Sequence, residues 1–181
     1  MIKALPLCLF LLAGPVFSIS PVNSFRTGVP PLNRSMGDAS EADTFQWVGL
    51  VPLKDGIPHT GWIKVNHEAV EGELEKVKAL TFYQRGVPGG PSYTWHPNGK
   101  IKAVGQFVEG VPTGAFWTAH DNGEIASRSF YRGGLLHGEA TAYYRNGALY
   151  LESRFEGGKP VSQSFWSKTG SPIFPGHSEA H

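Results

Sequence analysis

The sequence predicts an all-β protein, in which tandem β-hairpins form one elongated antiparallel meander sheet. Asparagine–glycine pairs recur every 24 residues, at Asn98-Gly99, Asn122-Gly123 and Asn146-Gly147. Other columns keep the same spacing: Gly90, Gly114 and Gly138; Ile101, Ile125 and Leu149; Phe107, Tyr131 and Phe155; Gly110, Gly134 and Gly158. A fixed period of this length is typical of repeat architectures, in which stacked neighbours stabilise each unit.

Each repeat reads as one hairpin. An Asn-Gly pair between two alternating stretches favours a two-residue type I′ turn, in which both central residues have positive φ. Next to the turns, the predicted pairs are His96 with Ile101, His120 with Ile125, and Tyr144 with Leu149. Farther from the turns, they are Trp95 with Lys102, Trp117 with Arg128, and Tyr143 with Tyr150. The segment 110–114 and its equivalents then return the chain, so that successive hairpins join one meander.

The segments flanking the repeats have a different composition. Residues 1–18 have a basic start and a short apolar stretch, which predicts a signal peptide cleaved after Ser18. We interpret residues 19–44 as a flexible leader, residues 45–173 as the repeat domain, and residues 174–181 as a disordered tail. The expected location is therefore secreted or periplasmic, and the mature chain is not expected to insert stably into a membrane.

The cysteine content and the net charge argue against several classes of function. Cys8 is the chain's single cysteine, so cleavage after Ser18 would leave no thiol for disulfides, nucleophilic catalysis or metal binding. The same cleavage removes Lys3 from sixteen basic residues and leaves fifteen, which balance fifteen acidic ones. This neutral balance does not favour nucleic acid as a partner.

The repeat pattern resembles the variant MORN repeats of bacterial proteins, including those labelled YwqK-type antitoxins. The resemblance covers roughly residues 50–173, and the motif runs Phe107, Gly110, Gly114, Phe116, Trp117, His120, Asn122-Gly123 and Ile125. It implies an elongated sheet of hairpins that takes part in protein or membrane-surface interactions, without a shared catalytic residue. The antitoxin activity is not carried over, because a cytosolic toxin inhibitor would not need an export signal.

The candidate catalytic and metal-binding residues have simpler structural interpretations. His96, His120 and Tyr144 share one column of the repeat, and this alternation suits planar side chains packed along a sheet better than metal ligands. The segment 67–71 resembles a zinc-protease motif, but Glu71 stands where the second histidine is required. We therefore expect neither a metal nor a cofactor, and no enzymatic activity.

Aromatic residues are the stronger functional candidates. The predicted register places five of them on one face: Tyr93, Trp95, Trp117, Tyr143 and Tyr150. Such a face either packs on another layer or binds a partner. We expect an exported interaction scaffold that binds an unidentified protein or envelope component. The alternative is a cell-wall or glycan-binding module that uses the same face. The sequence leaves the oligomeric state open.

Overall fold

The computed structural model describes residues 39–68, 71–72 and 74–174, and confirms the predicted all-β fold. Its elements are β1 (Ser40–Glu41), η1 (Ala42–Thr44), β2 (Gln46–Val48), β3 (Val51–Lys54), β4 (Ile57–Pro58), β5 (Gly61–Asn66), β6 (Val77–Gln84), β7 (Val87–Trp95), β8 (Ile101–Val108), β9 (Val111–Ala119), β10 (Ile125–Arg132), β11 (Leu135–Leu136), β12 (Gly138–Tyr143), β13 (Leu149–Glu156), β14 (Lys159–Trp166) and β15 (Pro172–Ile173). The expected signal peptide and most of the expected leader lie outside the described residues, as does the tail beyond Phe174.

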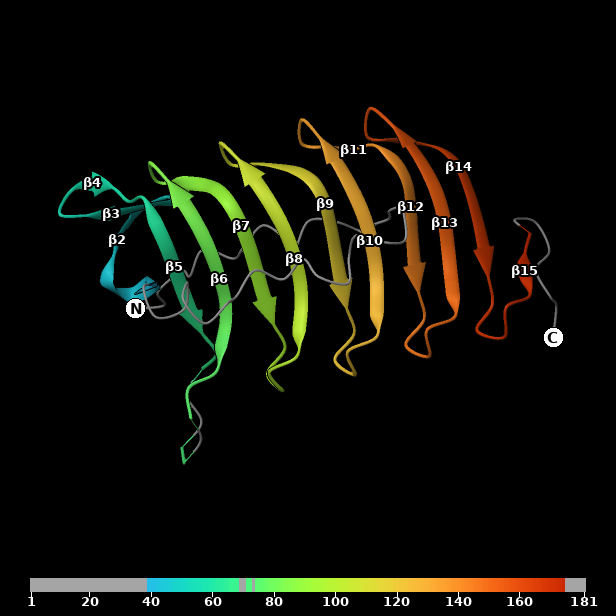
Figure 1. Ribbon diagram of the computed structural model, residues 1–181, viewed down its shortest axis with the longest axis horizontal. Coiled ribbons are helices and arrows are strands. Elements are labelled where there is room, and N and C mark those ends of the chain that lie inside the picture. Colours follow the sequence, from blue (N-terminus) through green and yellow to red (C-terminus); the bar gives the residue numbers. More distant parts are fainter. Residues whose placement is uncertain (1–38, 69–70, 73, 175–181) are drawn as a thin grey trace.

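Twelve strands form one long sheet (Figure 1). From β5 to β15 neighbouring strands follow one another along the chain and pair antiparallel, with β11 attached to β10 beside the main path. Antiparallel neighbours need only short turns, which explains why a period of 24 residues is long enough for two strands and two turns. The predicted elongated meander is thus confirmed.

The N-terminal end of the sheet is structurally different. β1 pairs parallel with β5, and a separate three-stranded sheet of β2, β3 and β4 adjoins this end. Ala42, Phe45, Ile63 and Tyr83 form a buried cluster there. The ordered domain therefore begins before residue 45, where the sequence had placed its boundary, because residues 40–44 contribute β1 and η1 to this packing.

The Asn-Gly turns lie at the lower edge of the sheet in Figure 1, and their type differs from the prediction. Gly99 N–H donates to the carbonyl of His96, and His96 N–H to the carbonyl of Lys100, both at 2.9 Å. Gly99 has φ +81°, whereas Asn98 is not among the described residues with positive φ. This is a three-residue loop, a type I turn followed by a glycine in the left-handed region, and not a type I′ turn.

The extra loop residue moves the pairing next to each turn. Ile101 pairs with Trp95, Ile125 with Ala119, and Leu149 with Tyr143, so the predicted partners His96, His120 and Tyr144 were wrong by one position. The predicted pairs Trp95–Lys102 and Tyr143–Tyr150 are wrong for the same reason. A β-bulge then restores the expected register farther from the turn, and Trp117 lies opposite Arg128 as predicted.

Type I′ turns occur at the opposite, upper edge. Glu109 and Gly110 have φ of +50° and +79°, and the pair Val108–Val111 encloses them. Equivalent two-residue turns of the long sheet are Arg85-Gly86, Gly133-Gly134 and Gly157-Gly158, and Asp55-Gly56 forms one in the separate three-stranded sheet. The residues that the sequence interpretation treated as connections between hairpins are therefore the tighter turns of the sheet.

In β8 to β10 the strands bury one face and expose much of the other, whereas β6 and β7 carry buried residues on both faces, among them Leu80 and Tyr93. In β8, Ala103, Gly105 and Phe107 are buried, whereas Lys102 and Gln106 are exposed. We name the two sides the buried face and the exposed face. A Cβ atom on Gly105 would lie 2.0 Å from the ring of Phe116, so only glycine allows this close packing.

Candidate functional site

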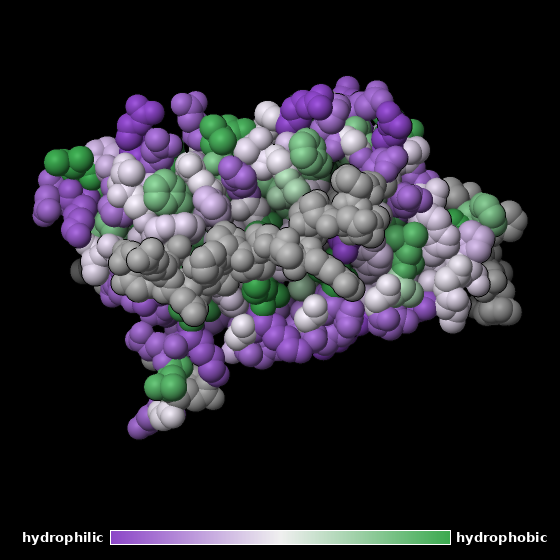
Figure 2. Space-filling view, viewed as in Figure 1, coloured by the Kyte–Doolittle hydropathy of each residue, from purple (hydrophilic) through white to green (hydrophobic). Residues whose placement is uncertain are grey.

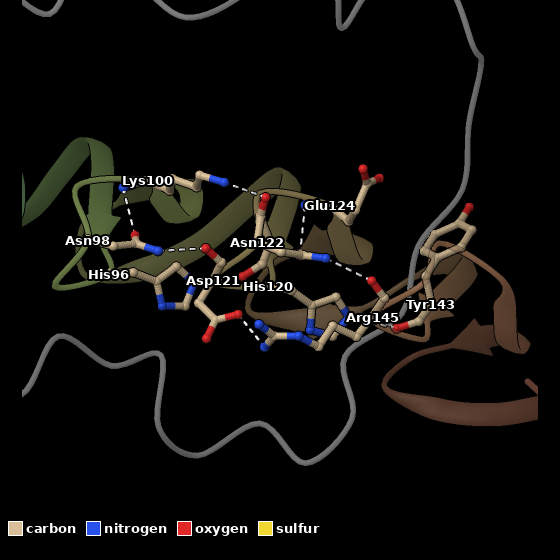
Figure 3. Close-up of polar contacts among 10 residues, drawn as sticks. His96, Asn98, Lys100, His120, Asp121, Asn122, Glu124, Tyr143 and Arg145 are labelled. Carbon is tan, nitrogen blue, oxygen red and sulfur yellow. Dashed lines mark hydrogen bonds and ion pairs between the residues drawn. The ribbon is translucent and has the colours of Figure 1, made fainter.

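A ladder of side-chain hydrogen bonds joins successive hairpins along the lower edge (Figure 3). The Nε2 atoms of His96 and His120 lie 2.9 Å from the carbonyl oxygens of Ala119 and Tyr143. The hydroxyl of Tyr144 donates to the carbonyl of Trp166 at 3.0 Å. His67 makes the corresponding contact with the carbonyl of Trp95 at 3.2 Å. Each ring therefore binds the last strand residue before the next lower turn.

These hydrogen bonds indicate whether His96 and His120 could bind a metal. A carbonyl oxygen only accepts hydrogen bonds, so Nε2 of His96 and of His120 must carry the proton. A protonated nitrogen cannot ligate a metal through the same atom. No group of three or more His, Cys, Asp or Glu side chains suited to a metal is found in the described ranges.

The turn asparagines form a second row of the same ladder. Oδ1 of Asn122 accepts from the backbone N–H of Glu124 at 3.1 Å, which stabilises its own turn. Its Nδ2 donates to the carbonyl of Arg145 in the next turn at 2.8 Å. Asn98 and Asn146 repeat both contacts. One amide thus stabilises its own turn and connects it to the next.

Charged side chains form additional, weaker contacts between the lower turns. Lys100 Nζ donates to the carbonyl of Asn122 at 2.6 Å, and Arg145 forms an ion pair with Asp121. The side chains of Arg145 and Asp121 are 63% and 50% exposed, so water screens their attraction. Exposed ion pairs of this kind contribute little to stability. The His, Tyr and Asn contacts are therefore the main connection between the lower turns.

The upper turns are linked mainly by backbone hydrogen bonds, and the Thr60 hydroxyl also accepts from the backbone N–H of Arg85 at 2.8 Å. Gly110 N–H donates to the carbonyl of Pro88 at 2.7 Å, and Gly158 N–H to that of Leu136 at 2.9 Å. Gly86 and Gly134 make equivalent bonds. Sequence reasoning missed this row, although the recurring glycine column and the Asp-Gly and Gly-Gly pairs were the available signal. Both edges of the sheet thus join neighbouring hairpins, which holds the array in one shape.

The structure assembles only part of the expected five-residue aromatic face: Tyr93 and Trp117 lie on either side of Val104 on one face, but Tyr93 is buried. Tyr93 and Trp95 are only 3% and 7% exposed, and they pack in a core cluster with Leu80. Burial raises the pKa of Tyr93 above its ordinary value. These two residues therefore stabilise the sheet and are not accessible to a partner.

Tyr150 and Tyr143 are also not paired as predicted. Tyr150 contacts the rings of Tyr144 and Phe165, and it packs against the cluster that contains buried Leu151. Tyr143 pairs with Leu149, and its carbonyl receives the hydrogen bond from His120. A bulge beside Tyr143 breaks the alternation that would have placed both tyrosines together.

Trp117 is the predicted aromatic that remains central on the exposed face. It is partly exposed and pairs with Val104 on one side and Arg128 on the other. On the same face, Phe130 is 38% exposed and lies opposite Ala115. Tryptophan and arginine are the side chains most enriched among residues that dominate binding energy.

Apolar side chains continue from this point to the upper edge of the same face. Val108 and Val111 pair beside their turn and are 52% and 41% exposed, and Leu135 is 52% exposed. Val111 lies 3.0 Å from the Cβ position of Gly134, so it contacts the next hairpin. In Figure 2, apolar side chains interrupt the hydrophilic ones along the upper edge. We name Val108, Val111, Trp117, Arg128, Phe130 and Leu135 the exposed-face patch.

The fold and its two linked edges define a class: a tandem β-hairpin repeat protein, whose hairpins are joined by side-chain and backbone ladders. Residues 88–109 and 136–156 match the family model of the MORN repeat variant, so the chain contains MORN repeats of the variant type. Each matched segment spans one lower-turn hairpin, β7 to β8 and β12 to β13. No curated protein and no solved structure matches the chain. Within the described ranges, no helix has the length and apolar character needed to cross a bilayer.

Proposed function

We propose that the protein is an exported, non-enzymatic scaffold that binds another protein through the exposed-face patch. The observation that supports this proposal most directly is the pairing of partly exposed Trp117 with Arg128, beside exposed Phe130. Such a group combines a large apolar area with a planar cation, which suits the centre of a protein interface. The two ladders favour a rigid surface, and a rigid surface loses little entropy on binding.

A glycan-binding module is the alternative. Sugar rings stack on exposed aromatic faces, and Trp117 and Tyr143 are partly exposed. The burial of Tyr93 and Trp95 leaves fewer such faces than the sequence suggested. The exposed valines and leucine near the upper edge have no role in sugar stacking. Together, these features favour a protein partner.

Crosslinking and affinity capture from the native envelope fraction test the proposal. The purified protein should capture a protein partner, and Trp117→Ala and Arg128→Ala should each reduce that capture about tenfold or more. Arg154→Ala is the matched control, because Arg154 is an exposed arginine on the same face, outside the patch. Circular dichroism and thermal melting verify that each variant is folded.

A separate binding measurement tests the glycan-binding alternative. Binding to purified envelope polysaccharide, without added protein, would favour the glycan module, particularly if Trp117→Ala weakens it. Capture that is equal for the wild type, Trp117→Ala and Arg128→Ala would reject the patch as the binding surface.

Export is part of the same proposal. It rests on the sequence of residues 1–18, with cleavage after Ser18. N-terminal sequencing of the protein from culture medium or periplasm should begin at Ile19. Recovery of the intact N-terminus from the cytoplasm alone would contradict export.

A further inference from the structure

Among the described residues, the buried face of the long sheet has a second layer only at its N-terminal end. There, Ala42 and Phe45 pack on Ile63 and Tyr83. From β7 to β13, no described helix or strand lies over this face (Figure 1). A sheet buries a face against another element, so something further covers these strands. Small side chains on this face are nevertheless buried, namely Ala103, Ser127, Ser129, Ala140 and Ser153.

The side chains of this face restrict what can cover it. The charged residues of β8 to β13, such as Lys102, Arg128 and Glu152, lie on the opposite face. Alanine, glycine, serine and threonine form the middle of the buried face and leave room for an extended chain above them. A largely apolar cover suits this surface best. One column of the repeat adds aromatic rings towards the upper turns: Phe107, Tyr131 and Phe155.

Hydroxyl groups on the same face can donate further hydrogen bonds. Thr118 Oγ1 and Ser127 Oγ lie 2.6 Å apart, so one donates to the other and the pair keeps a second proton. Ser129 is 2% exposed, and its Oγ makes no hydrogen bond, although the side chain of Tyr131 lies nearby. Backbone carbonyls are suitable acceptors for these protons, and an extended chain presents them along its whole length.

Residues 19–38 have the length that such a cover needs. They lead into β1, which pairs with β5 at the N-terminal end of the sheet. Burial of the face ends at β13, since residues 159–164 of β14 are exposed. The eight strands from β5 to β13 span about 34 Å, at about 4.8 Å between neighbours. Twenty residues in a polyproline-like conformation reach about 60 Å, which is enough to pass the edge and cross the face.

The composition of residues 19–38 also fits. They include Pro21, Pro30 and Pro31, and proline-containing chains bind aromatic-lined surfaces in an extended conformation. A proline keeps its carbonyl acceptor but has no N–H that needs a partner. The segment can therefore bury apolar side chains while its carbonyls accept from the serine and threonine hydroxyls. Larger apolar residues are distributed along it: Ile19, Val22, Phe25, Val29, Leu32 and Met36.

We propose that residues 19–38 lie extended across the buried face from β7 to β13 and form its second layer. Covalent attachment gives this segment a local concentration in the millimolar range, which favours it over a second copy of the chain or a separate partner. The segment that the sequence suggested as a flexible leader is then part of the folded domain. This inference goes beyond the proposed function, because it concerns the face opposite to the exposed-face patch.

The accessibility of a buried thiol tests the proposal in the full chain. In a Cys8→Ser background, Ser129→Cys places a thiol under the proposed cover, and Lys102→Cys places one on the exposed face as the control. Ser129→Cys should react with a thiol reagent at least about tenfold more slowly than Lys102→Cys. Adding Phe25→Ser and Leu32→Ser together should raise its reactivity towards that of the control. Circular dichroism should still show the strands.

Three outcomes of the thiol measurement would overturn the proposal. Ser129→Cys could react as fast as Lys102→Cys in the full chain, which would mean that nothing covers the face. Its protection could be lost on dilution, which would identify a second copy as the cover. Its protection could also be independent of Phe25 and Leu32, which would exclude residues 19–38.

Photo-crosslinking maps the same contact without weakening the fold. A benzophenone amino acid in place of Phe25 should crosslink within one molecule, to side chains on the buried face of β7 to β13, as located by mass spectrometry. Crosslinks to Trp117 or Arg128 on the exposed face, or between two molecules, would contradict the proposal. Partner capture by the exposed-face patch is measured separately, so the two proposals can fail independently.

Discussion

His120 donates its Nε2 proton to the backbone carbonyl of Tyr143, one full hairpin farther along the chain, at 2.9 Å. This single contact joins two repeats through a position that the sequence marks only as a column of His and Tyr. We therefore expect the stability of variants at His120 to depend on whether the new side chain can donate a hydrogen bond to the carbonyl of Tyr143.

His120→Phe should lower the free energy of unfolding by about 1–2 kcal/mol, because the ring remains while the carbonyl of Tyr143 loses its donor. His120→Tyr should be affected less, since Tyr144 makes the same contact to Trp166 with its hydroxyl. Chemical denaturation of both variants measures the difference. Equal stability of the Phe and Tyr variants would exclude a role for the hydrogen bond.

Asn122→Asp separates the two functions of the turn amide. The carboxylate still accepts from the N–H of Glu124, but it cannot donate to the carbonyl of Arg145. We expect a loss of about 0.5–1 kcal/mol at neutral pH, with the turn itself retained. Asn122→Ala removes both contacts and is the reference for complete loss. If Asn122→Asp melts like the wild type, the link to Arg145 does not contribute to stability.

Glu109→Asn should stabilise the protein by about 0.5–1 kcal/mol. Glu109 has φ +50°, a conformation that costs an ordinary L-residue roughly 1–2 kcal/mol, and asparagine tolerates it better. Glu124→Asn removes the same charge at an exposed position without a positive φ and should give no gain. Thermal melts of the two variants make the comparison. A larger gain from Glu124→Asn would refute the strain argument.

His59 should make stability depend on pH. Burial, and then the nearby charge of Lys54, lower the pKa of its imidazole below 6.5. The unfolded chain therefore binds the proton more readily than the folded one. This contribution is fully present above about pH 6.5 and is lost as the pH falls from there towards the folded pKa.

Unfolding by urea at several pH values measures this dependence, and His59→Phe is the control. Phenylalanine keeps a ring beside Phe45, which lies 4.6 Å from the imidazole, but it does not titrate. As the pH falls from about 6.5 towards the folded pKa of His59, the wild type should lose more free energy of unfolding than His59→Phe. Parallel curves would show that His59 does not cause the effect.

The repeat and the hairpins could be predicted because period and alternation are local properties of a sequence. The turn type could not, since an Asn-Gly pair fits both a two-residue type I′ loop and a three-residue loop with glycine last. The hydrogen bond from Gly99 N–H to His96 distinguishes the two. Conversely, the connection was predicted as residues 110–114, and Glu109 was not recognised as a turn residue, because glutamate is unusual at positive φ.

The aromatic prediction failed in part for a related reason. Tyr93 and Trp117 do share one face, on either side of Val104, whereas Tyr150 is the extra residue of the bulge between the pairs Ala142–Leu151 and Tyr143–Leu149. Burial of Tyr93 depends on Leu80, which follows from pairing between strands and not from any local pattern.

The sequence by itself determined that this protein is a row of hairpins, because glycines, aromatics and Asn-Gly pairs at fixed spacing specify strands and turns locally. Only the tertiary structure decided which residues of each face are exposed and which turns are tight. Those features depend on contacts between residues one repeat or more apart, and the energy of such contacts is absent from any short segment.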